Sequence, residues 1–176
     1  MGFMMTAALI VFMGWIFVRS MNREKAGLDR SKAIKARLSA AHGLEDVFVF
    51  PGDGGFLGLS AAGDRILIGK DEAEQALAVA DLLAIEGLRD ETVLVRAARS
   101  GGDLTPAPSS RNPADLPERI RSLSLRLTTA DGVHTVLFFD GGKHGVAPSN
   151  EAFRQQAGQT EAWFRKLSNA MRLEQA

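Results

Sequence analysis

Cysteine and tyrosine are both absent from this chain of 176 residues, and strong signatures of catalysis are absent as well. The lack of cysteine excludes disulfides, thiolate zinc sites and cysteine nucleophiles, so packing and hydrogen bonding must stabilise the fold. The sequence contains no phosphate-binding loop, nucleophile elbow, H-E-x-x-H zinc motif or dinucleotide fingerprint. We therefore expect a protein that is not an enzyme, with no catalytic residues and no cofactor.

Candidate metal ligands and acid–base groups are scattered. The three histidines, His42, His134 and His144, fall in different predicted elements, which argues against a shared metal site. His134 follows an apparent turn and is predicted to be a partly solvated scaffold residue. Five aspartates precede or occupy apparent turns, where turn chemistry accounts for them: Asp53, Asp64, Asp90, Asp131 and Asp140.

An overall excess of one charge sign is also absent, because 21 basic residues balance 21 acidic ones. The balance hides a split: residues 19–37 contain seven basic and two acidic residues, whereas the chain after residue 37 contains 14 basic and 19 acidic ones. Nucleic-acid binding usually needs a clearly basic domain with interleaved aromatic residues, or a known motif. An acidic body without tyrosine offers neither, so nucleic acid is not an expected partner.

One long apolar run is present at the N-terminus. Residues 2–18, GFMMTAALIVFMGWIFV, carry no charge and have almost the length that a membrane-spanning helix needs. No basic residue precedes the run and no clear cleavage site follows it, so we predict an anchor rather than a secretory signal. The basic collar that follows it, Arg19, Arg23 and Lys25, predicts a cytoplasmic body with the N-terminus outside.

After the anchor (residues 1–18), residues 19–43 are predicted to form a basic, solvated helical stalk that ends at Gly43. Residues 44–176 are predicted to form the folded body. Within it, residues 98–118 contain four of the six prolines and are predicted to be a flexible loop, whose order the sequence leaves open.

Two hairpins are predicted in the body. Residues 56–69, FLGLSAAGDRILIG, alternate around Ala62-Gly63, which places Leu59 opposite Ile66 and Leu57 opposite Ile68.

Residues 122–139, SLSLRLTTADGVHTVLFF, alternate around Asp131-Gly132. A type I′ turn there would pair Leu127 with Val136 and Leu125 with Phe138. Leu123 continues the apolar face, so both strands point an apolar wall at one core.

The last segment is predicted to be an amphipathic helix that begins at a Ser149 or Asn150 cap and covers this wall. Its apolar stripe recurs at helical spacing: Phe153, Ala157, Thr160, Phe164, Leu167 and Met171, flanked by Trp163.

The order of these parts, with the SLSLRLTTADGVHTVLFF hairpin, a Gly-rich loop and FRQQAGQTEAWFRKL in the last helix, resembles bacterial and phage pleckstrin-homology-like domains. In particular, it looks like uncharacterised membrane-anchored proteins that carry such a domain, and the resemblance covers about residues 44–173. It implies an α+β fold: a transmembrane helix and stalk, then a bent antiparallel sheet or barrel capped by the C-terminal helix. The implied location is the bacterial inner membrane, with a single pass.

The same resemblance bears on residues 71–88, DEAEQALAVADLLAIEGL, whose alanine and leucine content favours a helix. In the family pattern this stretch leads into a hairpin. On that reading, residues 85–88 pair with residues 92–95 about Arg89-Asp90, and we prefer it to the helix.

We predict a non-enzymatic module that docks a protein partner at the inner face of the membrane. A sensor of anionic lipid surfaces is the alternative, and the resemblance also allows an immunity or exclusion protein of a bacterial or phage system. The partners would then be the lipid bilayer and an unidentified protein. The candidate interaction surface gathers around the Pro-rich loop: Arg96, Arg99, Arg111, Arg119, Arg121 and Arg126.

Overall fold

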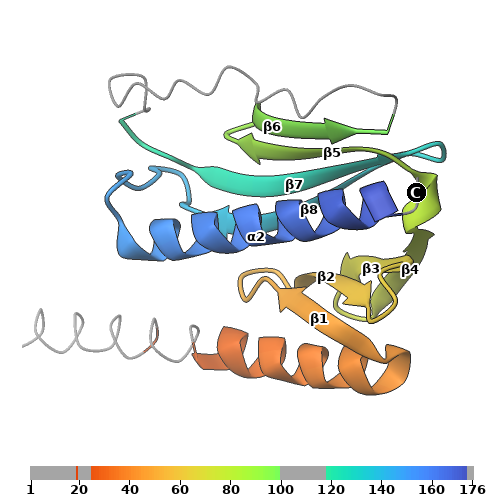
Figure 1. Ribbon diagram of the computed structural model, residues 1–176. Helices are drawn as coiled ribbons and strands as arrows, with labels where there is room; N and C mark the ends of the chain where they lie inside the picture. The colour runs from red at the N-terminus through yellow and green to blue at the C-terminus, as the bar shows by residue number, and fades with distance from the viewer. Residues whose placement is uncertain (1–18, 20–24, 100–117, 174–176) are drawn as a thin grey trace, which may run out of the picture.

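The computed structural model describes residue 19, residues 25–99 and residues 118–173 (Figure 1). These residues form two four-stranded antiparallel sheets, with strand orders β1-β2-β3-β4 and β6-β5-β7-β8. The first sheet contains β1 (Leu44–Val49), β2 (Gly55–Ser60), β3 (Arg65–Lys70) and β4 (Ala73–Ala78). The second contains β5 (Leu82–Arg89), β6 (Thr92–Ala98), β7 (Ser122–Thr129) and β8 (Val133–Asp140). A helix covers residues 25–42, the 3₁₀ turn η1 covers Val79–Asp81, and α2 covers Glu151–Leu173.

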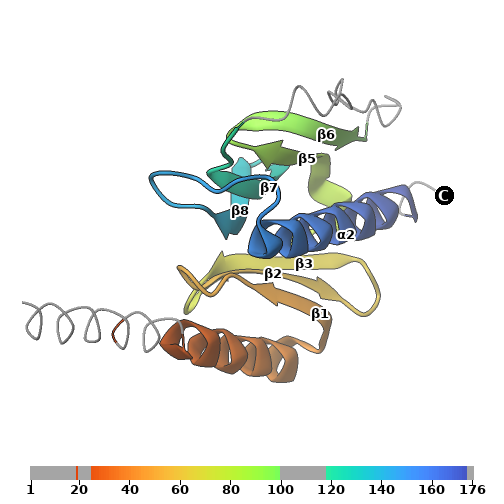
Figure 2. The same cartoon turned by 90° about the vertical axis from the view of Figure 1, so that its left-hand side faces the viewer.

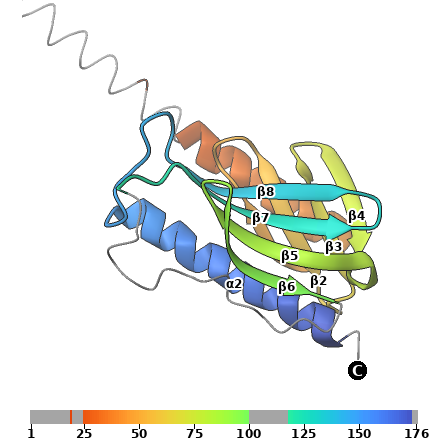
Figure 3. The same cartoon turned by 90° about the horizontal axis from the view of Figure 1, so that it is seen from above.

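The elements are stacked in layers. Helix 25–42 lies on one face of the first sheet, while α2 lies on the opposite side of that sheet and against the second sheet (Figure 2). Viewed from above, the second sheet lies over the first, with α2 along its β6 side and β8 at the opposite border (Figure 3). The two sheets also meet directly, because the Phe48 and Phe138 rings stack with centroids 3.9 Å apart.

The predicted membrane anchor is corrected here. In the part of the chain that the structure describes, no helix is long and apolar enough to cross a membrane. Helix 25–42 carries charged residues on its outer face, and α2 has a single apolar stripe that it uses for packing. The predicted span, residues 1–18, lies outside the described residues. The bitopic, single-pass inner-membrane location with a cytoplasmic body is therefore withdrawn.

The predicted stalk is also wrong. Residues 25–42 are helical, but they belong to the folded body because Ile34 and Leu38 are buried against the outer face of the first sheet. Two residues at a spacing of four lie on the same face of a helix, so Ile34 and Leu38 both pack against the sheet. The helix ends as predicted: Gly43 adopts a φ of 59° and donates its N–H to the Ser39 carbonyl at 3.1 Å.

The single bent sheet or barrel expected from the resemblance is replaced by two separate sheets. The break falls at η1, between β4 and β5, where the chain leaves the first sheet. Arg99 stabilises this break, because its guanidinium donates to the Val79 and Leu82 carbonyls at 2.8 and 3.0 Å. The second sheet is not a simple meander, since β5 pairs with both β6 and β7.

The 56–69 hairpin is confirmed in its register, with Leu57 opposite Ile68 and Leu59 opposite Ile66. The turn contains Gly63 with a φ of 73°, which a residue with a side chain rarely adopts. Ser60 donates its hydroxyl to the Asp64 carboxylate at 2.6 Å and accepts the Arg65 N–H at 3.1 Å.

This turn predicts a response to acid. The hydrogen bond from Ser60 lowers the pKa of Asp64 below its usual 3.8. A carboxylate whose pKa is lower in the folded state stabilises the fold above its unfolded pKa, and this contribution is lost as the pH falls through the folded pKa. Asp64→Asn should therefore lose less stability than wild type as the pH falls from about 4 through the lowered pKa of Asp64.

Urea unfolding at each pH measures this difference. Asp131→Asn makes the same chemical change in the exposed turn between β7 and β8 and is the matched control. Identical acid dependence in Asp64→Asn and wild type would contradict the assignment.

The ambiguous stretch 71–88 is mostly extended, as β4, η1 and the larger part of β5. The preferred hairpin is confirmed as the β5–β6 pair, in which Leu88 lies opposite Val93 and Arg89 opposite Thr92. Its turn lies one residue later than predicted, at Asp90-Glu91, and both residues have a positive φ.

The 122–139 hairpin forms, but its register differs from the prediction by two residues. Leu125 lies opposite Val136, and Leu127 lies opposite His134. A type I′ turn needs a positive φ at both central residues, and neither Asp131 nor Gly132 has one. The strands β7 and β8 are instead joined by three residues.

The helix that covers this wall is confirmed. Asn150 caps α2, because its side-chain oxygen accepts the Phe153 N–H at 3.0 Å. The predicted stripe of α2 faces the core, with Thr160, Phe164, Leu167 and Met171 buried and Phe153 and Ala157 partly buried. The apolar wall of β7 and β8 lies in the same core: Leu123, Leu125, Leu127, Val136 and Phe138.

Candidate functional site

Two of the predicted surface arginines are already engaged on the outer face of the second sheet. Glu86 of β5 lies between Arg96 of β6 and Arg126 of β7, with N···O distances of 3.5 and 3.3 Å. Their strands place the three residues directly opposite one another. The carboxylate offsets part of the positive charge that a ligand would otherwise meet.

Two further predicted arginines, Arg99 and Arg119, direct their side chains to other parts of the described chain. Arg99 donates to backbone carbonyls at η1, and Arg119 donates to the Gly145 carbonyl at 3.3 Å. The backbone N–H of Arg121 donates to the Asp90 carboxylate at 2.8 Å. Arg111 lies outside the described residues. The lipid-sensor hypothesis, which needs these cations for a ligand, stays a prediction.

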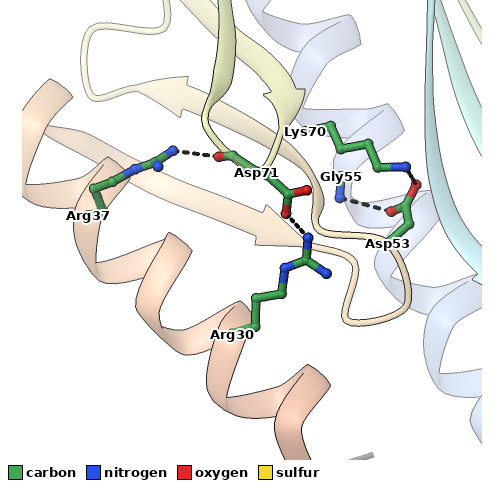
Figure 4. Close-up of polar contacts among 6 residues, drawn as sticks. All are labelled: Arg30, Arg37, Asp53, Gly55, Lys70 and Asp71. Carbon is green, nitrogen blue, oxygen red and sulfur yellow. Dashed lines mark hydrogen bonds and ion pairs between the residues drawn. The ribbon is translucent and has the colours of Figure 1, made fainter. Parts of the chain in front are cut away.

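The basic collar is described only in part. Lys25 lies exposed in the first turn of helix 25–42 that the structure describes, and Arg19 is exposed as well, whereas Arg23 lies outside the described residues. Two other cations of this helix, Arg30 and Arg37, face the first sheet. Figure 4 shows both reaching Asp71 at the β3–β4 turn: Arg30 pairs with the carboxylate, and Arg37 donates to the carbonyl at 2.7 Å.

The predicted turn aspartates act largely as turn residues. Asp53 accepts the Gly55 N–H at 2.9 Å and pairs with Lys70 at 3.2 Å (Figure 4). Asp140 accepts the Gly142 N–H at 2.7 Å. Asp90 bonds instead to residues that are distant in the sequence: its carboxylate accepts the N–H groups of Arg121 and Ser122, both at 2.8 Å. These bonds hold the start of β7 beside the β5–β6 turn.

The three histidines are separated. His42 pairs with Glu74 at 2.7 Å, which also accepts a hydrogen bond from Arg37 at 2.8 Å. His134 is half-buried on β8, and His144 is exposed in the loop before α2. Among residues 19, 25–99 and 118–173, no group of three His, Asp or Glu side chains could hold a metal ion.

An apolar concavity lies between the β5–β6 hairpin and α2, and we call it the α2 groove. Its volume is about 480 Å³. The floor is formed by Leu94 and Val95 of β6, Leu123 of β7, and Phe153, Ala157 and Phe164 of α2. Leu94 and Phe153 are only partly buried, so the groove offers apolar side chains to a ligand.

The rim of the α2 groove is charged, with three arginines against one glutamate. Arg165 pairs with Glu161 at 2.5 Å and Arg96 pairs with Glu86, whereas no ion pair is formed by Arg89 with any described residue. The net charge that faces a ligand is therefore positive.

Sequence reasoning missed this site. Arg96 is the one groove residue that it proposed for interaction, because it looked for clusters of arginine along the chain; the apolar groove residues that it named were assigned to the core. A signal was present in TVLVRA of β6, where three consecutive apolar residues break the alternation expected of a half-buried strand. The partner surface on α2 lies about 60 residues further along the chain, and only the fold brings the two together.

No family model, curated protein or solved structure matches this chain. The resemblance to pleckstrin-homology-like proteins, and the immunity or exclusion role that it allows, therefore stay predictions.

Proposed function

We propose that this protein is a non-enzymatic interaction module, and that it binds an amphipathic, acidic helix of a partner protein in the α2 groove. The observation that carries the proposal is the apolar floor of about 480 Å³ with an arginine rim. Binding grooves typically combine an apolar lining with a few polar groups that fix orientation.

The length of the groove supports a helical ligand. Its α2 wall runs from Phe153 to Arg165, which at 1.5 Å per residue is about 18 Å. A partner helix of about twelve residues matches that length, and amphipathic helices commonly bind grooves through apolar residues at positions i, i+3, i+4 and i+7.

The rim supports an acidic ligand. Charge complementarity at the edge of an interface guides association and selects partners more than it adds affinity. The floor is surrounded by three arginines and one glutamate. A ligand with glutamate or aspartate beside its apolar anchors is therefore favoured over a ligand with lysine there.

A peptide library tests this proposal. The probe is a displayed library of 14-residue helical peptides with leucines at i, i+3, i+4 and i+7 and with glutamate or lysine at the flanking positions. The full chain should enrich peptides with flanking glutamates. Leu94→Asp should abolish binding of the selected peptide, because it places a carboxylate in the apolar floor. Arg89→Glu should weaken binding by about tenfold, measured by fluorescence anisotropy.

The control is Arg154→Glu, which reverses an exposed charge of α2 that does not line the groove. Its peptide affinity should equal that of wild type. Enrichment of lysine-flanked peptides, no enrichment at all, or equal losses in Arg89→Glu and Arg154→Glu would each overturn the proposal.

A further inference from the structure

β8 forms one border of the second sheet, opposite the border formed by β6 (Figure 3). The outer edge of β8 lines a second groove. Four consecutive residues of β8, His134–Leu137, form one wall. The other wall is formed by residues 68–70 and 73–75 of the β3–β4 hairpin, and the volume is about 430 Å³. We call it the β8 groove. It is separate from the α2 groove, with which it shares no residue.

The register shows which backbone groups face outward from β8. The Thr129 N–H donates to the Gly132 carbonyl at 2.9 Å, which makes these two residues a hydrogen-bonded pair. Hydrogen-bonded and non-hydrogen-bonded pairs alternate along antiparallel strands. Leu127 opposite His134 is therefore hydrogen-bonded, and Arg126 opposite Thr135 is not.

Thr135 and Val133 consequently turn their backbone N–H and C=O groups away from β7. No strand of the described chain pairs with this edge. Val133 is 61% exposed and Thr135 is exposed as well. An edge with free backbone groups is a template on which an additional strand can pair.

A second observation concerns His134, one of the residues that line the groove. The Nε2 atom of His134 is buried, yet it has no hydrogen-bond partner. A buried polar atom without a partner costs free energy relative to its hydration in water, and native structures contain few of them. A ligand in the β8 groove that offers a hydrogen bond would satisfy this atom.

We propose that an extended peptide segment of a partner protein binds in the β8 groove as an additional antiparallel or parallel strand of the second sheet. Its backbone would pair with Thr135, and a polar group would reach His134 Nε2. Beside His134, the apolar Val136 and Ile68 line the groove together with the polar Lys70 and Gln75, which share the face of Ile68. The ligand therefore needs a polar and an apolar side chain two residues apart on one face.

The test uses the full chain and a displayed library of random eight-residue peptides, which is counter-selected on Thr135→Pro. Proline removes the outward N–H but no hydrogen bond to β7, so the fold should be retained. Peptides that survive should bind wild type and lose at least tenfold in affinity to Thr135→Pro. Their addition should slow hydrogen exchange at the Thr135 amide, which exchanges faster than the Val136 amide in the free protein.

Two further variants keep the test decisive if Thr135→Pro fails to fold. Thr135→Val keeps the backbone N–H and should bind as wild type does, whereas His134→Phe removes Nε2 and should weaken binding several-fold. Leu94→Asp in the α2 groove should leave this binding unchanged, which separates the two sites.

Three results would overturn the proposal. In the first, every selected peptide binds wild type, Thr135→Pro and His134→Phe with the same affinity. In the second, bound peptide slows hydrogen exchange elsewhere than in β8. In the third, wild type alone forms dimers that Thr135→Pro abolishes in sedimentation experiments, so that a second copy of the chain occupies the edge.

Discussion

Replacing Leu125 with aspartate is expected to abolish cooperative folding. Leu125 is 0% exposed at the centre of β7, in the core that both sheets and α2 share. An unpaired charge in such a site costs several kcal/mol, and the total stability of a small domain is about 5–15 kcal/mol. Circular dichroism during heating should show no sharp transition in Leu125→Asp.

The matched control is Leu83→Asp, which makes the same chemical change in a strand of the same sheet. Leu83 is 47% exposed, so the new carboxylate stays hydrated and the cost should be below about 1 kcal/mol. If both variants melted at the temperature of wild type, the inner face of β7 would be assigned wrongly.

The sequence predicted the core well even where it predicted the pairing wrongly. The β7–β8 register is displaced by two residues, because three residues join the strands and the Thr129 N–H bonds to Gly132. A shift of two residues leaves every side chain on its original face, whereas a shift of one would reverse them all. The predicted apolar wall is therefore correct, although the predicted register is not. The β2–β3 register was correct because Gly63 fixes a short turn between matched strands.

The parts that failed depend on contacts between distant segments. Nothing in the alternation of β5 shows that it pairs with β7, which follows it by more than 30 residues. The resemblance suggested one bent sheet, but η1 and the Arg99 hydrogen bonds divide the strands into two. The surfaces that remain open depend on that division. The apolar run of β6 was therefore the sequence's one sign of the α2 groove, and the β8 groove had none.

The two grooves differ in what they recognise. The α2 groove presents side chains, so its affinity should depend on the apolar anchors and charges of a ligand. The β8 groove presents backbone groups, so any extended segment with a suitable alternation can pair there, and His134 adds selectivity. The two grooves share no residue, and β6 and β8, which line one groove each, form opposite borders of the second sheet (Figure 3). A ligand in one groove therefore leaves the other open.

The second large effect is expected at Leu38, which decides whether helix 25–42 is a stalk or a part of the fold. Leu38 is 0% exposed and packs with Phe56 and Leu67 on the outer face of the first sheet. Leu38→Ala leaves a cavity there and should cost about 2–5 kcal/mol in the free energy of unfolding, measured with urea.

Leu28 provides the control, because it lies on the same helix and is 48% exposed. Alanine has the higher helix propensity, so neither substitution weakens the helix itself, and the two variants differ only in the packing that they remove. Leu28→Ala should change stability by less than about 0.5 kcal/mol. Equal, small effects at both positions would show that the helix does not pack on the first sheet. A large effect at Leu38 alone would show that the domain begins before β1, because its first sheet needs a helix on the outer face to exclude water from Phe56 and Leu67.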